Sequence, residues 1–166
     1  VQLKSVTDKN AIGRIISGGI VGSNKGISID RNISLPTFTN KDIEVMKIAN
    51  KLKLKTIFLS FSSSANDVKL LRNLFDYDVN IISKIESRSG IVNIDEICEE
   101  SDGILIDRGD LSRDVPLENI AFAQKYILDK ASNNQKPVYI ATNLMESMIK
   151  SSKPTRAEVN DIYNTL

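Results

Sequence analysis

The sequence predicts an α/β fold in which a short parallel sheet is covered by helices. Four short apolar runs have the composition of strands, and their first residues lie 24, 23 and 34 positions apart. Helix-like segments separate them, which is the spacing of strand–helix units in a parallel sheet. A closed barrel of eight such units needs about 250 residues. A chain of 166 residues therefore holds about four units, either half of a barrel or a small open sheet.

The first part of the chain has a different composition. Five of the eight glycines fall between Gly13 and Gly26, beside short β-branched runs such as Ile15-Ile16. This pattern predicts β-hairpins with glycine-rich turns. The length allows one core and at most a domain with an appendage, and the composition changes at Leu35.

From Leu35 onward, helical and strand-like patterns alternate. Ile43, Met46 and Ile48 recur near the 3.6-residue period of a helix. The run Ser62–Ser64 is suited to cap a following helix, and its amides could alternatively receive an anion. Strands are expected at residues 56–61, 80–86, 103–107 and 137–142, and helices at 41–50, 66–74, 94–100, 117–133 and from 156 onward.

Composition excludes several classes of function. The 22 Lys and Arg against 21 Asp and Glu give a net charge of +1, which is no basic field for nucleic acid, so we expect no nucleic-acid partner. The chain contains no His, so imidazole catalysis is excluded. Cys98, the single cysteine, is expected to be a buried apolar residue because no His exists to activate it.

The chain also lacks the sequence features of membrane and secreted proteins. No run of about 18 apolar residues occurs, so we expect no membrane partner. The first residues lack the basic and then apolar pattern of a signal peptide. We expect a cytoplasmic protein, with an organellar location as the alternative.

Polar residues follow each predicted strand, at the edge where parallel α/β folds place their reactive groups. The period of two in a strand puts Lys84 and Glu86 on one face, at the end of the second run. A lysine beside a carboxylate suits an anionic substrate that is held partly through a divalent metal. The alternative is a solvated ion pair.

Two other strand ends carry candidate ligands. Asp110 could complete a site for a hard metal with Glu86, and Gly109 lets backbone amides approach a ligand closely. The alternative for Asp110 is a turn residue that caps the segment at Leu111. Thr142 could bind a substrate carboxylate through its hydroxyl or could cap a helix.

These residues belong to an ordered set of motifs, and through them the chain strongly resembles the pyruvate kinase family. The pair Ser83–Glu86 and Arg108–Leu111, followed by Pro154–Glu158, is the most specific part. The agreement extends from about Gly19 to Leu166. The matching runs are Lys25-Gly-Ile27, Leu35-Pro36, Lys41-Asp42, Ile57-Phe-Leu-Ser-Phe61, Ile82-Ser-Lys-Ile-Glu86, Ser101-Asp-Gly-Ile104, Arg108-Gly-Asp-Leu111, Ala141-Thr142, Glu146-Ser-Met148 and Pro154-Thr-Arg-Ala-Glu158.

The resemblance implies a (β/α)₈ barrel interrupted by a small β lid domain. Residues 1–32 would be the returning end of the lid, and the four strands would be the fourth to the seventh of the barrel. The implied reaction is phosphoryl transfer from phosphoenolpyruvate to ADP, which gives pyruvate and ATP, with Mg²⁺ (or Mn²⁺) and K⁺. The intact enzyme would be a homotetramer.

The resemblance also implies roles for individual residues. Lys84 would be catalytic and would bind the transferring phosphoryl group and the enolate, while Glu86 and Asp110 would hold the divalent metal. The backbone amides of Gly109 and Asp110, with the Thr142 hydroxyl, would bind the substrate carboxylate. Thr142 would also be catalytic, because the enolate would be protonated near it.

The chain departs from the family pattern at several positions. Asp107 replaces a small residue and adds a negative charge next to the expected metal site, and Ser112 replaces a glycine. Asn143-Leu144 stands where Gln-Met is common, and Ser62–Ser64 where an apolar residue and a basic pair are usual. The family's K⁺ ligands and nucleotide-binding Arg fall outside this chain, so the segment alone is expected to be inactive.

Two alternatives to the phosphoryl-transfer reading remain open. One is a lyase that uses the same enolpyruvate and metal chemistry. The other is a non-catalytic binding or regulatory half-barrel, for which Asp107 and the serine run are the sequence support.

Overall fold

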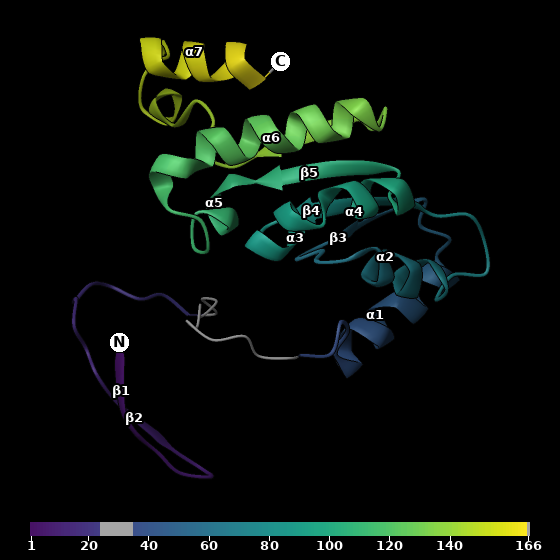
Figure 1. Ribbon diagram of the computed structural model, residues 1–166, viewed down its shortest axis with the longest axis horizontal. Coiled ribbons are helices and arrows are strands. Elements are labelled where there is room, and N and C mark those ends of the chain that lie inside the picture. The colour runs from purple at the N-terminus through teal and green to yellow at the C-terminus, as the bar shows by residue number, and fades with distance from the viewer. Residues whose placement is uncertain (24–34, 166) are drawn as a thin grey trace. The chain divides into compact units, whose positions relative to one another are not determined.

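We describe the protein from a computed structural model, which covers residues 1–23 and 35–165 (Figure 1). Contacts within the chain divide it into two units, Val1–Asn32 and Ile33–Leu166. The strands are β1 (Gln2–Val6), β2 (Ala11–Arg14), β3 (Thr56–Leu59), β4 (Asn80–Ile85), β5 (Gly103–Asp107) and β6 (Val138–Ala141). The helices are α1 (Asn40–Lys51), α2 (Ala65–Arg72), α3 (Arg88–Val92), α4 (Ile94–Glu100), α5 (Arg108–Leu111), α6 (Ile120–Asn133) and α7 (Arg156–Thr165), with 3₁₀ turns η1 (Leu117–Asn119) and η2 (Glu146–Ile149).

The first unit contains one antiparallel hairpin, made by β1 and β2. A polar turn closes it: the Thr7 amide donates to the Asn10 carbonyl at 2.8 Å, and the Asn10 amide donates to the Thr7 hydroxyl at 3.1 Å. The prediction of glycine-rich hairpin turns is wrong for Gly18 and Gly19, which lie outside any strand or hairpin turn. Side-chain hydrogen bonds at Thr7 supply the turn instead of glycine. Another β-branched run beside these glycines, Ile27-Ser28-Ile29, lies outside the described residues.

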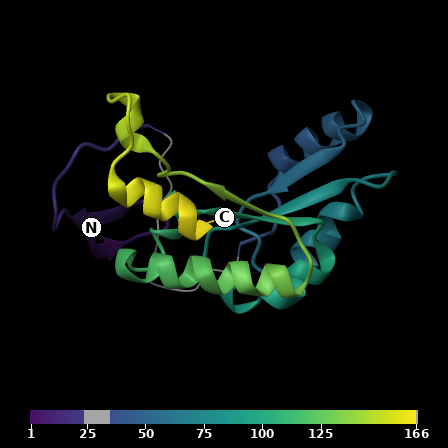
Figure 2. The ribbon, with the colours of Figure 1, turned by 90° about the horizontal axis from the view of Figure 1, so that it is seen from above.

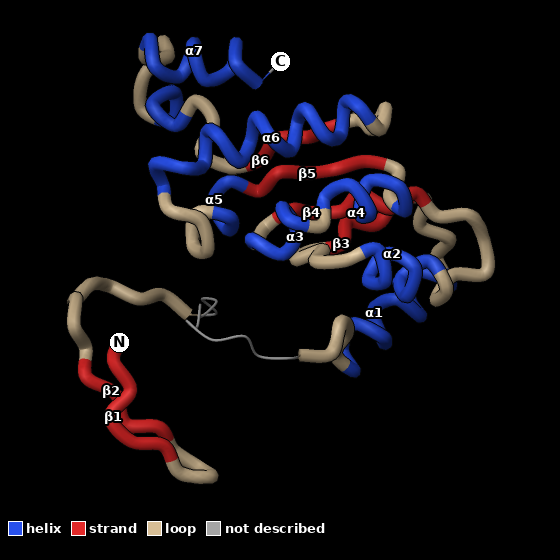
Figure 3. The backbone as a smooth tube through the Cα atoms, in the orientation of Figure 1, coloured by secondary structure: helices blue, strands red, loops and turns tan. Residues whose placement is uncertain are grey.

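The second unit is built on a four-stranded sheet, and the α/β prediction with a parallel sheet is confirmed. The strands follow the order β3-β4-β5-β6, and each neighbouring pair is parallel (Figure 3). All four predicted strands form, each within two residues of its expected bounds. Because neighbouring strands run in the same direction, their carboxyl ends lie at one edge of the sheet.

One face of this sheet packs against helices. Alternate strand residues, among them Leu59, Ile81, Ile85, Ile104 and Ile106, form one buried cluster with residues of α2, α4 and α6. In the view of Figure 2, α6 runs along one side of the strands. Burial of these side chains is the main favourable contribution to folding this unit.

The opposite face of the sheet carries no helix among the described residues. Phe58 of β3 and Tyr139 of β6 lie on it and are about half exposed, at 52% and 48%. Side chains alternate between the two faces along each strand, so one face is apolar and covered by helices and the other is open. Lys84 belongs to the open face.

Capping side chains fix where the two helices beside β3 begin. Thr39 and Asp42 form a capping box at α1, and Ser64 and Asp67 form a second one at α2. The carboxylate of Asp67 also accepts hydrogen bonds from the amide and hydroxyl of Ser63. The capping interpretation of the serine run is thus confirmed.

Some short elements were not expected from the sequence pattern. Helices α3 and α5 and the turn η2 are only four or five residues long, too short for a helical period to show. The predicted helix at 117–133 begins as the 3₁₀ turn η1 before it continues as α6. Among the described residues, no helix is both long enough and apolar enough to cross a bilayer.

Candidate active site

Three strand ends, those of β4, β5 and β6, bring polar groups together at the carboxyl edge of the sheet. Lys84 lies in β4, and Glu86 is the first residue after that strand. Asp107 ends β5 and passes into α5, which contains Asp110. Thr142 follows β6, in register with Asp107 through its neighbour Ala141. The parallel register is the reason that residues far apart in sequence meet here.

Lys84 lies between two carboxylates. Its Nζ atom is 2.6 Å from Glu86 Oε1 and 3.4 Å from Asp107 Oδ2. The prediction that Lys84 and Glu86 share a face and an end of the strand is confirmed. The Lys84 side chain is 20% exposed and that of Glu86 only 1%, so the pair is not the solvated surface ion pair that the sequence left as an alternative.

The electrostatics of the pair favour a charged lysine. Burial alone lowers the pKa of Lys84, but the proximity and charge of Glu86, together with the charge of Asp107, outweigh it, and the net pKa is raised. Lys84 is therefore a permanent cation at neutral pH. It can neutralise charge on an anionic ligand, but it has no free base form with which to abstract a proton.

The two oxygens of Glu86 have different environments. Oε2 accepts a hydrogen bond from the Phe61 amide at 2.6 Å, and Phe61 has the left-handed backbone conformation (φ 52°). Oε1 is buried and, among the described residues, has no hydrogen-bond donor of suitable geometry, only the ion-pair contact to Lys84. A buried carboxylate oxygen without a hydrogen bond is costly, unless a cation completes its shell.

Glu86 belongs to a group of three carboxylates at this edge of the sheet. One oxygen from each of Glu86, Asp107 and Asp110 lies within 4.8 Å of the other two. Asp110 also contacts Arg113 at 3.0 Å. Carboxylate oxygens are the ligands that Mg²⁺ and Mn²⁺ prefer. The donor set therefore fits a hard divalent metal, and the observation that supports this fit is the buried Glu86 Oε1, which makes no hydrogen bond and has only the Lys84 ion pair among the described residues.

Asp107 caps the short helix α5, a function that the sequence analysis had considered for Asp110. Its Oδ1 accepts from the Asp110 amide at 3.4 Å and lies 3.1 Å from the Thr142 hydroxyl. The capping alternative for Asp110 is therefore wrong, because the cap precedes the helix. Strand alternation would have revealed Asp107, since it lies on the same face as Lys84 in the neighbouring strand.

Thr142 has an unusual backbone conformation for a β-branched residue. Its φ is 68°, and Asn143 follows with φ 56°, which costs about 1–3 kcal/mol per residue. The hydroxyl accepts from the Gly109 amide at 2.7 Å, and its single proton can go to Ala141 O at 2.6 Å or to Asp107 at 3.1 Å. Thr142 is exposed and caps no helix of its own.

Gly109 permits this close approach between α5 and the end of β6. A Cβ atom at position 109 would lie 3.2 Å from Thr142 Oγ1, tighter than ordinary contact. Packing against Thr142 therefore requires a small residue at position 109, and the expectation that Gly109 lets backbone amides approach a ligand stays a prediction.

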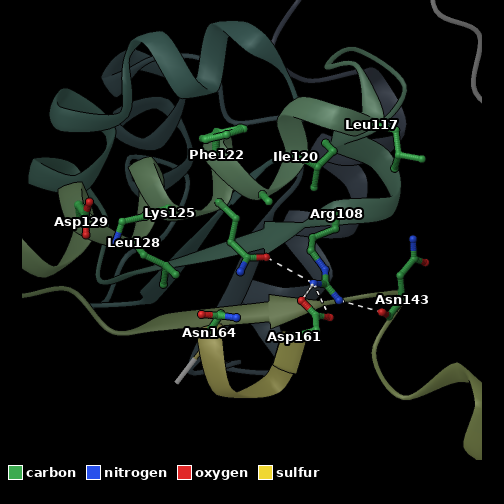
Figure 4. Close-up of a pocket in the computed structure, with 12 residues that line it drawn as sticks. Arg108, Leu117, Ile120, Phe122, Lys125, Leu128, Asp129, Asn143, Asp161 and Asn164 are labelled. Atoms are coloured by element: carbon green, nitrogen blue, oxygen red, sulfur yellow. Dashed lines mark hydrogen bonds and ion pairs between the residues drawn. The ribbon is translucent and has the colours of Figure 1, made fainter. Parts of the chain in front are cut away.

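Arg108 holds the strained segment in place, a role that the sequence analysis did not assign. Its guanidinium donates to the carbonyls of Thr142 (3.1 Å) and Asn143 (2.8 Å) and forms an ion pair with Asp161 of α7 at 2.7 Å (Figure 4). Arg108 is 7% exposed. These contacts fix the Thr142 backbone and offset part of its strain.

A pocket of about 600 Å³ lies beside Arg108, between residues of α6 and α7. Figure 4 shows Phe122, Leu128 and Asn164 along it. Its lining does not include Lys84, Glu86, Asp110 or Thr142. It therefore belongs to the helix layer, and the chemistry lies at the strand ends instead.

The fold and the site define a class: a parallel α/β protein with a lysine and a hard-metal donor set at the carboxyl ends of its strands. The chain matches the family described as "Pyruvate kinase, barrel domain" over residues 1–166. It is 38% identical to a pyruvate kinase of Candida albicans, over 99% of this chain and 34% of that protein. Pyruvate kinases of Corynebacterium glutamicum and Mycobacterium tuberculosis are 37% and 36% identical, each over 98% of this chain and 35% of the relative.

The chain therefore belongs to the pyruvate kinase family. It spans about a third of the length of the relatives that it matches. The resemblance predicted from the motifs is confirmed.

Proposed function

We propose that the protein containing this chain transfers a phosphoryl group from phosphoenolpyruvate to ADP and so gives pyruvate and ATP. Family membership supports this reaction. The single observation that carries it is the buried Lys84–Glu86 pair, beside Asp110 and the accessible Thr142. A fixed cation next to a metal donor set is an arrangement that stabilises charge on a transferring phosphoryl group.

Glu86 and Asp110 are the residues that would hold Mg²⁺ or Mn²⁺, with Asp107 within reach as a third carboxylate. The bound metal supplies a positive charge that offsets the negative charge of the substrate oxygens. The three carboxylates outnumber the two cations that contact them in the described part of the chain, Lys84 and Arg113, so the site is net negative. A divalent cation restores the balance before an anionic substrate binds.

Lys84 would neutralise the phosphoryl oxygens and the enolate as they develop charge. Its raised pKa supports an electrostatic role, because the ammonium group stays charged. Thr142 would bind the substrate carboxylate and stand near the carbon that is protonated. The Gly109 amide already donates to Thr142 Oγ1 and the Asp110 amide to Asp107, so both amides must exchange partners to bind a carboxylate.

At the level of the whole protein, we propose that residues 33–166 supply strands four to seven of a (β/α)₈ barrel and that residues 1–32 end the lid domain. The parallel sheet order supports the first part, and the hairpin of β1 and β2 is consistent with the second. Three further properties of the intact protein stay predictions: a K⁺ site outside this chain, assembly as a homotetramer, and a cytoplasmic or organellar location.

The test is an assay of the longest polypeptide that contains this chain, with phosphoenolpyruvate, ADP and Mg²⁺. We expect Lys84→Met and Glu86→Gln each to lower pyruvate formation by about 100-fold or more. Lys53→Met is the matched control, because Lys53 forms an exposed ion pair with Asp76. Full activity in both site variants would contradict the role assignments.

The non-catalytic alternative has lost one of its two supports. The serine run is a helix cap in the structure, whereas Asp107 still adds a carboxylate to the site. An intact protein that binds neither Mn²⁺ nor oxalate in calorimetry would favour this alternative. The lyase alternative would require cleavage of a hydroxy acid by a protein that leaves phosphoenolpyruvate unchanged.

A further inference from the structure

One cation and two hydrogen-bond donors lie close together at the carboxyl edge of the sheet. They are the Lys84 ammonium, the Asp110 backbone amide and the Thr142 hydroxyl. They come from β4, from α5 and from the segment after β6. A cation, an amide and a hydroxyl that point to one place form an anion-binding set.

A side chain of the protein itself occupies this set. Asp107 places Oδ1 3.1 Å from the Thr142 hydroxyl and 3.4 Å from the Asp110 amide, and Oδ2 3.4 Å from Lys84 Nζ. The residue is 8% exposed, so its carboxylate cannot turn freely into solvent. All three contacts are longer than an ideal charge-assisted hydrogen bond.

We infer that Asp107 is an internal carboxylate that competes with the carboxylate of a ligand for Lys84, Asp110 N and Thr142. This inference rests on the proposed function, because it concerns how the same site receives its substrate. The carboxylate of a ligand finds these donors already bound to Asp107. The negative charge of Asp107 also repels it at short distance. Asp107 thereby weakens the binding of any ligand carboxylate at this site, that of the proposed substrate included.

The geometry separates this role from that of a simple metal ligand. Among the described residues, Glu86 Oε1 has one neighbour, the Lys84 ammonium at 2.6 Å, and no hydrogen bond, whereas Asp107 has three neighbours, a cation, an amide and a hydroxyl. A metal ion would share Glu86 Oε1 with Lys84, but it would have to displace an amide and a hydroxyl to use Asp107 Oδ1. The donors around Asp107 are those that an anion requires.

The test measures oxalate binding by calorimetry in the presence of Mn²⁺, and Mn²⁺ binding alone. It uses the chain in the longest polypeptide that contains it, as wild type, Asp107→Ala and Asp107→Asn. We expect oxalate to bind about tenfold or more tightly to Asp107→Ala than to wild type. Asp107→Asn should be intermediate, because it removes the charge but keeps an acceptor of the same shape.

Asp129→Asn is the matched control, because it removes the same charge from an exposed position on α6, and it should leave oxalate affinity unchanged.

Melting curves show whether each variant is folded. If Asp107→Ala does not fold, Asp107→Asn still allows the test, because its side chain keeps the shape of the helix cap. Equal or weaker oxalate binding in the folded variants overturns the inference alone. A loss of Mn²⁺ affinity with no gain for oxalate also overturns it and makes Asp107 a metal ligand. If no variant binds Mn²⁺ or oxalate, the proposed function fails as well.

Discussion

Glu86 shows how one buried charge organises its neighbours. The carboxylate is almost fully buried, and its two principal contacts are the Phe61 amide on Oε2 and the Lys84 ammonium beside Oε1. Burying a carboxylate without such compensation costs several kcal/mol. The strand end is therefore stable only while the cation is present, either the lysine alone or the lysine together with a bound metal.

This dependence gives a stability prediction for Lys84. Lys84→Met should destabilise the fold by about 3 kcal/mol, because it leaves a buried carboxylate without its cation. The double variant Lys84→Met with Glu86→Gln should recover most of that loss, since it removes the uncompensated charge too. Urea unfolding at neutral pH measures both, and equal stability of the single variant and wild type would contradict the prediction.

The sign of the pH dependence follows from the raised pKa of Lys84. A group with a raised folded-state pKa binds its proton more tightly in the folded protein. The stabilisation from this ion pair is therefore complete below pH 10.5, the ordinary value, and it is lost as the pH rises through the higher folded-state pKa.

Residue-scale features differ in how far the sequence predicts them. Lys84 and Glu86 are two positions apart on one strand, so alternation alone places them together. Cys98 is buried as expected, and burial is the main cause that raises its pKa to about 11. By contrast, the contacts of Arg108 reach 35 and 53 positions along the chain, and no local pattern encodes partners at such separations.

At the scale of elements, Glu158 joins the turn η2 to the start of α7. Its carboxylate accepts from the amide and hydroxyl of Ser147 and from the amide and hydroxyl of Thr155. These hydrogen bonds, that of the Ser147 hydroxyl above all, lower the pKa of Glu158 to about 2. One side chain therefore satisfies donors from both elements.

Glu158→Gln should loosen this junction, because the neutral amide is a weaker acceptor for four donors. Since the folded-state pKa is depressed, the wild-type contribution is complete above pH 4.5 and is lost as the pH falls toward 2. Hydrogen exchange of the amides in residues 147–158 should be faster in the variant at pH 6. Glu146→Gln, an exposed neighbour in η2, is the control, and equal protection in all three proteins would contradict the expectation.

For the α/β unit as a whole, the open edges of the sheet are the main consequence of its topology. In the described part of the chain, β3 and β6 each pair with one strand only. The sheet face without helices also exposes Phe58 and Tyr139. Unpaired edges and exposed aromatic side chains both favour association.

We therefore expect this chain on its own to associate at micromolar concentrations and above. The double variant Phe58→Lys with Tyr139→Lys should shift its sedimentation toward the monomer, because the charges disfavour stacking and edge pairing. Phe122→Lys, an equally apolar exposed site on α6, should leave association unchanged. A wild-type chain that stays monomeric and melts sharply would count against half of a barrel.

Local periodicity, short motifs and spacing are enough to predict the α/β class, the four parallel strands, the serine cap of α2 and the family. The sequence by itself also placed Lys84 and Glu86 on one face of β4. Only the tertiary structure decided that Asp107 lies among the donors of Lys84, Asp110 and Thr142, and that Arg108 fixes the Thr142 backbone. The physical reason is that those contacts join separate strand ends, and only the register of the assembled sheet brings such ends within hydrogen-bond distance.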